Sequence, residues 1–373
     1  MKRKKIAFLI ITLSGGGAER VVSNLLLNLE NKKYKKYLIL FDGEKISYPF
    51  EGELLKLNSF KKNNGIFKII NLILAFFKLM KIKKENNFDI VISFLDIPNF
   101  YNLLTKKNEK CFLSVRNYIS DAYKGFKGRI YKFIIVNFYK KADKIIAVSK
   151  ECKKDLIENY SSNKEKTISI PNFYDLEKIK ELSSESLEEK YKRIFKKQVI
   201  INSGRLIYQK GQKHLINAFS KLKNRNEYNL VILGEGNLRK ELEIQIKRLN
   251  LENEVFLLGF QENPFKFLAK SHVYLFPSFY EGFPNALAEA MACGLPVISS
   301  NCKSGPSELL DKGKYGILIE NYKDIKILEK EMEKNIELLE NEKKYKEYKD
   351  KSLKRIRYYS KENIVKIWDQ NCF

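Results

Sequence analysis

Histidine, cysteine and long apolar runs are scarce in this sequence, and each scarcity excludes a class of protein. The 373 residues include two histidines and five cysteines. The cysteines are odd in number, widely spaced and form no C-x-x-C pair, so we expect neither a disulfide framework nor a zinc site. The sequence has no His/Cys/carboxylate cluster and no D-x-D motif, so we expect no metal site. This cysteine usage favours a reducing cytoplasm.

No apolar run is long enough to cross a membrane. The longest, Ile69–Phe77, is interrupted by Asn71 and is far shorter than the roughly 18–20 residues that a span needs. It continues into four lysines, Lys78, Lys81, Lys83 and Lys84. Bulky apolar residues beside lysines are typical of a helix that lies on an anionic membrane surface, although a helix packed on a sheet has the same pattern.

Nucleotide-binding fingerprints of two common kinds are also missing. Gly15-x-Gly17 is followed at the third position by Arg20, and Gly234-x-Gly236 by Arg239, so neither completes G-x-G-x-x-G. This weakens an oxidoreductase interpretation. Without a Walker A sequence, a P-loop kinase or ATPase is not expected either.

Positive charge is abundant and unevenly distributed. The formal net charge is +25, and residues 1–150 carry 30 Lys+Arg against 12 Asp+Glu, hence 30 − 12 = +18. A basic domain has nucleic acid as its default partner. No helix-turn-helix, zinc finger or RNP-like aromatic motif accompanies the charge, so we expect no nucleic-acid partner. The basic start, Met1–Lys5, precedes a short apolar run without a cleavage site, which predicts a buried strand and not a secretory signal.

Short β-branched runs alternate with amphipathic stretches of helical length, which predicts βα units and parallel sheets. In the first half we expect strands at Ile6–Thr12, Tyr37–Phe41, Asp89–Ser93, Lys110–Val115, Lys144–Val148 and Thr167–Ile170. The expected helices there are Ala18–Leu29, Ile66–Lys84, Lys127–Ala142 and Lys150–Tyr160. In the second half we expect strands at Val199–Asn202, Leu230–Gly234, Val255–Leu258, Val273–Phe276, Val297–Ser299 and Ile317–Ile319. Its expected helices are His214–Lys223, Leu238–Leu249, Asn285–Ala292, Asp324–Glu340 and Lys361–Gln370.

The charged stretch 175–197 has no strand signal, so the interdomain connection is expected near it. We predict an α/β protein with two doubly wound, Rossmann-like domains, residues 1–180 and 181–355. Residues 356–373 are expected to form a terminal helix that carries Trp368 and packs back on the first domain. Ligands bind such folds in the crevice at the carboxyl ends of the strands.

Three motifs follow predicted strands. Ser14–Arg20 offers glycine backbone N–H groups and a helix start to a phosphate, although a tight turn needs the same glycines. In Gly204–Gly211, a guanidinium and an ammonium five residues apart can clamp a diphosphate, although surface basicity alone also explains them. Phe276–Ser299 contains Glu281 in a Gly/Pro loop and Glu289 inside the next helix, embedded in E-G-F-P-N-x-x-x-E.

These motifs together resemble glycosyltransferase family four, whose members have the GT-B architecture and transfer a sugar from a nucleotide donor with retention of configuration. The resemblance spans nearly the whole chain. It is strongest for bacterial enzymes that build surface glycans, including N-acetylgalactosamine transferases acting on polyprenyl-diphosphate-linked sugars. The residues that carry this subgroup likeness are Ser14–Arg20, Ile92–Asp96 and Ser300–Glu308.

The resemblance implies roles for individual residues. Arg205 and Lys210 would hold the donor diphosphate and stabilise the departing nucleotide, Glu281 would touch the transferred sugar, and Glu289 would bind the ribose hydroxyls. The sugar and phosphate pocket would be lined by the backbone of Phe283, Pro284, Asn285 and Ala286. The base would meet Gly259 and Phe260, and the phosphates would be covered from the first domain by Gly16 and Gly17.

The first domain departs from the family in one place. Many members have a histidine where this sequence reads Ser114-Val115-Arg116-Asn117, so Arg116 is our candidate for contact with acceptor or sugar. Both histidines, His214 and His272, lie in the second domain and are expected to be structural.

The predicted function is therefore a metal-independent transfer of a hexose or N-acetylhexosamine. The donor is expected to be a UDP-sugar, which is a substrate, so no cofactor is expected. The acceptor is expected to be lipid-diphosphate-linked or a glycan, met at the inner face of the cytoplasmic membrane. Two alternatives remain: a sugar-nucleotide epimerase of the same fold, and a non-catalytic module that binds anionic lipid or nucleic acid.

Overall fold

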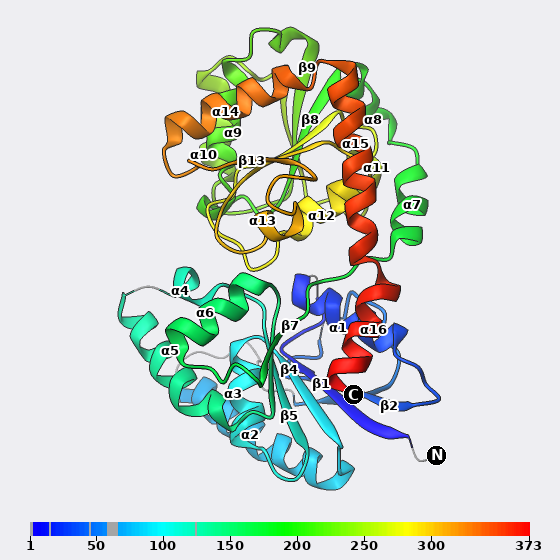
Figure 1. The fold of residues 1–373 in the computed structure, drawn as a ribbon, viewed down its shortest axis with the longest axis vertical. Helices are drawn as coiled ribbons and strands as arrows, with labels where there is room; N and C mark the ends of the chain where they lie inside the picture. The colour runs from blue at the N-terminus through cyan, green and yellow to red at the C-terminus, as the bar shows by residue number, and fades with distance from the viewer. Residues whose placement is uncertain (1–2, 15, 45, 58–65, 124) are drawn as a thin grey trace. The chain divides into compact units, whose positions relative to one another are not determined.

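The chain folds into two compact units, which we describe one at a time (Figure 1). The computed structural model describes residues 3–14, 16–44, 46–57, 66–123 and 125–373. The first unit comprises Met1–Phe173 and Glu362–Phe373, and the second comprises Tyr174–Lys361. The sequence-based limits were 180/181 and 355/356. The last helix belongs to the first unit, because Ile364 and Trp368 lie in that unit's core.

The first unit is built on a seven-stranded parallel sheet with the order β3-β2-β1-β4-β5-β6-β7. Its strands are β1 (Lys4–Ile10), β2 (Tyr34–Leu40), β3 (Glu53–Lys56), β4 (Ile90–Phe94), β5 (Lys110–Val115), β6 (Lys144–Ala147) and β7 (Thr167–Ser169). The central strands are buried along most of their length and are mainly apolar, because helices cover both faces of a parallel sheet.

Alternate side chains of the first sheet pack in two separate cores. Phe8 belongs to the core with Trp368, beneath helices α1 (Gly17–Asn28) and α16 (Lys361–Cys372), and Figure 1 shows α16 beside α1. Leu9 belongs to the core with Leu79, beneath helix α2 (Ile66–Asn86). The remaining helices of this unit are α3 (Asp96–Leu104), α4 (Ile119–Ala122), α5 (Gly125–Phe138), η1 (Tyr139–Lys141) and α6 (Lys150–Tyr160).

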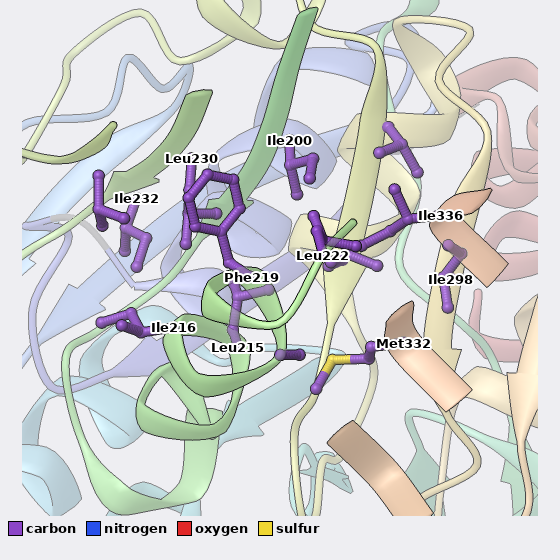
Figure 2. Packing of buried hydrophobic residues seen from close by; sticks show 14 of the residues in the cluster. Ile200, Leu215, Ile216, Phe219, Leu222, Leu230, Ile232, Ile298, Met332 and Ile336 are labelled. Carbon is purple, nitrogen blue, oxygen red and sulfur yellow. The ribbon is translucent and has the colours of Figure 1, made fainter. Parts of the chain in front are cut away.

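The second unit is built on a six-stranded parallel sheet with the order β10-β9-β8-β11-β12-β13. Its strands are β8 (Gln198–Ser203), β9 (Tyr228–Leu233), β10 (Val255–Gly259), β11 (Val273–Phe276), β12 (Val297–Ser300) and β13 (Ile317–Ile319). Figure 2 shows the core on one face, where Phe219 of helix α9 (Gln212–Ser220) packs with Leu230 and Ile232. Met332 of α14 (Ile325–Leu338) joins the same core.

The other helices of the second unit flank this sheet. They are α7 (Leu176–Ser184), α8 (Glu189–Lys192), η2 (Ile194–Lys196), η3 (Tyr208–Lys210), η4 (Arg225–Glu227), α10 (Arg239–Arg248), α11 (Phe265–Leu268), α12 (Asn285–Ala292), α13 (Pro306–Leu309), α15 (Glu342–Ile356) and η5 (Arg357–Tyr359). In the part of the chain that the structure describes, we find no helix with the length and apolarity needed to cross a bilayer.

Several helices and strands have the bounds that the sequence predicted, and several observed elements were not predicted. Strands β5, β11 and β13 and helices α6 and α12 have the predicted bounds. The sequence missed the short edge strand β3, and it missed α3, in which Pro98 stands in the first turn, where its missing N–H costs nothing. The stretch 175–197, expected near the interdomain connection, contains α7 and α8 and belongs to the second unit.

The longest helix that the sequence missed is α15. Most of its residues are charged, so its apolar residues are too sparse for a clear helical pattern. Tyr348 packs against the core and Ile356 is buried, while the Asn341 side chain caps the helix start and the Ser352 hydroxyl donates to the Leu295 carbonyl at 2.7 Å.

Candidate active site

The two loops that carry the strongest motifs lie side by side in the second unit. One follows β8 and the other follows β11, and the order of the strands in the sheet reverses between these two neighbours. Ligands bind at such a switch point, at the carboxyl ends of the strands. Strand order therefore brings together residues that are about seventy positions apart in the sequence.

Three contacts join the loop after β8 to the loop after β11. The Phe279 N–H donates to the Gln209 carbonyl at 2.9 Å, and the Gln209 side chain donates to the Tyr280 carbonyl at 2.7 Å. The third contact is an ion pair between Lys210 Nζ and Glu281 Oε1 at 2.6 Å. Two of the predicted catalytic residues thus touch each other.

The Lys210–Glu281 ion pair is largely shielded from water. The Lys210 side chain is 16% exposed and the Glu281 side chain 8%. The ammonium also lies 5.4 Å from the ring centroid of Phe276. Removing charges from water is costly, and mutual attraction offsets the cost. A diphosphate that approaches Lys210 would therefore compete with Glu281 for this cation.

Arg205 lies in the same loop but is exposed to solvent. The conformation of this loop depends on Gly211, which has φ +68° and directly precedes α9. A Cβ at Gly211 would lie 2.3 Å from the Pro277 carbonyl oxygen, so only glycine lets the β8 and β11 loops approach this closely. The Gln212 side chain donates to the Arg205 carbonyl at 3.1 Å and fixes the backbone on the other side.

The E-G-F-P-N segment forms the rim of the site and leads into α12. The Ser304 hydroxyl donates to the Gly282 carbonyl at 2.7 Å. A Cβ at Gly305 would lie 2.3 Å from Pro284 Cδ, so the chain after β12 packs closely against this rim. The Asn285 side chain accepts a hydrogen bond from the Tyr174 hydroxyl at 2.8 Å.

The second carboxylate of the motif, Glu289, lies on α12 and is 8% exposed. Burial raises the pKa of the Tyr274 hydroxyl, and the negative charges of Glu289 and Glu281 raise it further. Both carboxylates therefore act on one buried tyrosine. Phe283 is buried in the loop that precedes α12, and Ala286 lies in the first turn of that helix.

The predicted base-contacting residues stand two strands away from the Arg205 loop. Gly259 ends β10 with φ +74°, and the Gly234 N–H donates to its carbonyl at 2.7 Å. Phe260 follows and is 75% exposed, so its ring is available to a ligand. In sheet order, the loop after β9 lies between Phe260 and Arg205.

In the first unit, the glycine turn stands at the corresponding switch point, after β1. Gly16 precedes α1, and its N–H donates to the carboxylate of Glu19. Gly17 is the first residue of α1, and both glycines are exposed. Gly15 lies outside the described residues. A carboxylate at a helix N-terminus shows that this position accepts negative charge.

Arg116 directly follows β5 and is 9% exposed. Its Nη2 donates to the Asn172 side chain, and its Nη1 lies 3.4 Å from the Ser114 hydroxyl. The guanidinium carbon lies 5.9 Å from the ring centroid of Phe94. The sequence analysis named Arg116 and included Phe94 in Ile92–Asp96 without a role, because strand pairing and not sequence proximity brings the two together.

Asp96 ends the motif Ile92–Asp96, and the sequence predicted no function for it. It starts α3 at the end of β4, beside the glycine turn in strand order, and accepts a hydrogen bond from the Tyr123 hydroxyl. Burial raises the pKa of its carboxyl. Ser304, which holds the rim in the second unit, lies in the motif Ser300–Glu308, but no role was predicted for it. Tyr174 was missed, and no local sequence signal identifies it.

The remaining predicted residues have the following environments. His214 Nδ1 lies 3.3 Å from Glu329, and the ring of His272 stacks on Tyr345 at 4.3 Å between centroids. Within the described ranges, His, Cys, Asp and Glu side chains form no group of three with the geometry to hold a metal ion. The second unit collects Arg205, Lys210, Glu281 and Glu289 at one edge of its sheet, and the first unit carries Arg116 and the glycine turn at the same edge of its own.

Comparison with known proteins divides the chain in nearly the same way. Residues 15–178 match the family described as Glycosyltransferase Family 4, and residues 183–355 match the Glycosyl transferases group 1 family. An uncharacterized glycosyltransferase of Methanocaldococcus jannaschii is 36% identical over 92% of this chain and 93% of its own.

A named relative comes from Campylobacter jejuni. It is the N-acetylgalactosamine-N,N'-diacetylbacillosaminyl-diphospho-undecaprenol 4-alpha-N-acetylgalactosaminyltransferase, 35% identical over 97% of this chain and 98% of its own.

Solved structures share the fold. The crystal structure of HepE from Anabaena in complex with UDP and glucose has a TM-score of 0.77, at 20% identity over 99% of both chains. The apo form of the lipopolysaccharide outer core galactosyltransferase WaaB has a TM-score of 0.74, at 23% identity over 98% of both chains.

Proposed function

The chain belongs to glycosyltransferase family 4 and is a nucleotide-sugar-dependent transferase of GT-B fold, and from that membership we propose what it transfers and where. The donor is a UDP-sugar that binds to the second unit. The acceptor is a lipid-diphosphate-linked glycan that binds to the first unit. Transfer takes place at an anionic membrane surface in the synthesis of a surface glycan. The observation that carries the proposal is the juxtaposition of the Arg205–Lys210 loop and the Glu281 loop at a sheet switch point.

Arg205 and Lys210 supply the positive charge that the reaction needs. Breaking a sugar–phosphate bond develops negative charge on the departing diphosphate. A guanidinium binds two phosphate oxygens at once, and an ammonium adds a point charge. Arg205 is exposed and free to reach a ligand, whereas Lys210 is fixed beside Glu281. We propose that these two cations do the work that a metal does in other transferases.

Glu281 and Glu289 recognise the two ends of the donor. When the diphosphate takes over Lys210, the Glu281 carboxylate is released to accept hydrogen bonds from the sugar hydroxyls. Glu289 on α12 accepts from the ribose hydroxyls, and the backbone from Phe283 to Ala286 lines the space beside them. Phe260 offers an exposed ring to the base. HepE binds UDP, which supports UDP as the nucleotide here.

Proton transfer follows from the same geometry. In the proposed donor complex the Glu281 carboxylate accepts hydrogen bonds from the sugar hydroxyls, so we assign it no role as the base. We propose front-side displacement with retention, in which the leaving phosphate oxygen takes the proton of the acceptor hydroxyl. Arg116 then contacts the sugar or the acceptor from the first unit.

The membrane part of the proposal rests on one apolar face of the first unit. Half of the large hydrophobic side chains that are exposed in the described residues, nine of eighteen, lie on three helices of this unit. They are Ile70, Ile73, Leu74 and Phe77 on α2, Ile97 and Leu104 on α3, and Phe126, Ile130 and Phe133 on α5. We call these nine residues the apolar face. An apolar patch of this kind marks an interaction site.

Contacts join the three helices that carry the apolar face. The Tyr101 hydroxyl on α3 donates to the Leu72 carbonyl on α2 at 3.0 Å. The rings of Phe100 on α3 and Phe138 on α5 lie 5.5 Å apart. The three helices that carry the apolar face are therefore neighbours.

Basic side chains border the apolar face. Lys78, Lys81 and Lys84 on α2 and Arg129 and Lys132 on α5 are exposed. The sequence also placed Lys83 in this cluster, but Lys83 is 3% exposed and pairs with Glu109 at 2.7 Å inside the unit. Apolar residues bordered by cations match the chemistry of an anionic bilayer surface. The Campylobacter relative has an undecaprenol-linked acceptor in its name, which supports a membrane-bound acceptor here.

A product assay tests the proposed function. Purified protein is incubated with a panel of UDP- and GDP-sugars and with lipid extract from the source cells, and released nucleotide and modified lipid are measured. Release should depend on one UDP-sugar and on lipid. Arg205→Ala should lower turnover by roughly 10²-fold or more. Arg225→Ala is the matched control, because Arg225 stands before β9 at the opposite edge of the same sheet and pairs with Glu254.

Three results would contradict the proposed function. The first is full activity in Arg205→Ala, and the second is no release of nucleotide from any donor. The third is an isomerised free nucleotide sugar without acceptor, which would identify an epimerase.

A further inference from the structure

A line of ring contacts connects the last helix of the chain to Arg116. The indole of Trp368 on α16 stacks on the Phe94 ring, with centroids 6.2 Å apart and an interplanar angle of 26°. The Arg116 guanidinium lies 5.9 Å from the same Phe94 ring. Trp368 and Phe94 are both 0% exposed, and Arg116 is 9% exposed. The three side chains are therefore packed in an interior where small movements are resisted.

Strand register explains why these residues meet. Phe94 at the end of β4 is paired with Ser114 of β5, and Arg116 is two residues beyond Ser114. Side chains two apart on an extended chain point to the same face. That face is the one covered by α16, since Phe94, Phe112 and Trp368 share one core.

Polar contacts fix the other side of the guanidinium. The Asn172 side chain, just after β7, accepts from Nη2, and the Ser114 hydroxyl lies 3.4 Å from Nη1. Neither group, nor the Phe94 ring, carries a negative charge. These three contacts orient the guanidinium.

The way Trp368 is buried indicates what it contributes. Its indole N–H has no hydrogen-bond partner among the described residues. Burying an N–H without a partner is unfavourable, and an aliphatic side chain would avoid that cost. The contribution of Trp368 is therefore its flat ring face, and that face lies against Phe94.

We propose that Phe94 and Trp368 are positioning residues that hold the Arg116 guanidinium in the orientation needed for transfer. The inference rests on the proposed function, in which Arg116 contacts the sugar or the acceptor. It assigns a role in the reaction to the last twelve residues, which the chain reaches only after completing the second unit. A guanidinium over an aromatic ring gains an attraction that is largest where water is excluded.

A double-mutant cycle tests whether the ring acts through Arg116. Phe94→Leu should lower kcat about tenfold in the wild-type background. In an Arg116→Ala background the same change should have no further effect. Trp368→Leu should behave like Phe94→Leu, while Trp368→Phe, which keeps a ring face, should restore most of the activity.

Phe41→Leu is the matched control. Phe41 is 0% exposed, packs edge-on to Tyr101 at 4.9 Å and belongs to the core on the other face of the same sheet. It should lower the melting temperature as much as Phe94→Leu but leave kcat unchanged. Equal losses of kcat for Phe94→Leu in both backgrounds would overturn the proposal, as would full activity in Arg116→Ala.

A measurement that does not need activity separates this inference from the proposed function. In protein labelled with ¹⁵N-arginine, the Nε–H resonance of Arg116 should carry a ring-current shift that Phe94→Leu abolishes. Trp368→Leu should move the same resonance if the indole sets the ring, whereas an unmoved resonance would overturn the positioning role. A wild type that transfers no sugar but passes this test would refute the proposed function and leave the positioning of Arg116 established.

Discussion

Lys210 and Glu281 form a largely buried ion pair 2.6 Å long, between two loops that the sheet order places side by side. The pair joins the cation expected to bind a diphosphate to the carboxylate expected to bind a sugar. In the proposed function, a donor diphosphate takes the place of Glu281 beside Lys210. Occupation of the phosphate site would then release the sugar-binding carboxylate.

This coupling predicts that Glu281→Gln changes binding and turnover in opposite directions. Without the negative partner, the Lys210 charge attracts a diphosphate more strongly, so UDP should bind about tenfold more tightly. Turnover should fall roughly 10²-fold because the sugar contact is lost. Calorimetry with UDP and steady-state kinetics measure the two effects. Glu289→Gln is the control and should weaken UDP binding, and weaker UDP binding in Glu281→Gln would refute the coupling.

The close approach at Gly211 predicts that an alanine destabilises the protein more there than at Gly125, although the two glycines have similar φ angles. Gly211 has φ +68° and Gly125 has φ +62°, but a Cβ at Gly211 meets a carbonyl oxygen at 2.3 Å and one at Gly125 meets nothing within 4 Å. Gly125→Ala should therefore cost about 1 kcal/mol from backbone conformation alone. Gly211→Ala should cost at least about 1 kcal/mol more, measured by chemical denaturation. Equal losses of unfolding free energy in the two variants would mean that the loops after β8 and β11 can move apart at little cost.

The apolar face predicts a defect in membrane binding that does not extend to donor binding. Phe133→Ser and Ile73→Ser remove side chains that are 65% and 52% exposed. Each should weaken sedimentation with anionic vesicles about tenfold, since burying one large apolar side chain contributes about 1.5 kcal/mol. Ile244→Ser on α10, a side chain 69% exposed in the second unit, is the control and should bind like wild type. UDP affinity should be the same in all variants, and undiminished sedimentation of Phe133→Ser would contradict the membrane role.

Burial of His272 predicts a loss of stability in acid. Burial lowers the pKa of His272 in the folded protein below its ordinary value of 6.5, so the unfolded chain binds the proton more readily. The free energy of unfolding should therefore fall as the pH decreases through about 6.5. His272→Phe keeps the stacking on Tyr345 and should remove this part of the pH dependence. Chemical denaturation at pH 7.5 and at pH 5.5 measures this pH dependence. An identical loss of unfolding free energy in wild type and in His272→Phe would exclude His272 as the source.

Most of the fold could be predicted because most of its strands are largely buried. Runs such as Lys110–Val115 and Val273–Phe276 are apolar and flanked by turn residues, so their type and bounds are fixed locally. Helix α15 was not predicted because most of its residues are charged, and its few packed apolar residues, such as Tyr348 and Ile356, are separated by lysines and glutamates. Sequence patterns predict elements with an obvious apolar stripe and fail where charged residues dominate the segment.

The candidate site was predictable in its residue types but not in its pairings. Arg205, Lys210, Glu281 and Glu289 were named from motifs, since glycine and proline mark the loops that carry them. The Lys210–Glu281 ion pair and the Arg116–Phe94 contact depend on which strands are neighbours. Strand order is a property of the whole sheet, and no local segment encodes it.

The place of α16 in the first unit has a consequence for how the protein is made. A ribosome releases the chain from its amino end, and the first unit needs Trp368 and Ile364 to fill the core around Phe8 and Phe94. Those residues emerge only after the whole second unit has been synthesised. The second unit can therefore complete its folding during translation, while the nascent first unit waits with the part of its sheet that α16 covers still exposed. Chaperone binding to stalled nascent chains should persist until Ile364 and Trp368 have left the ribosome.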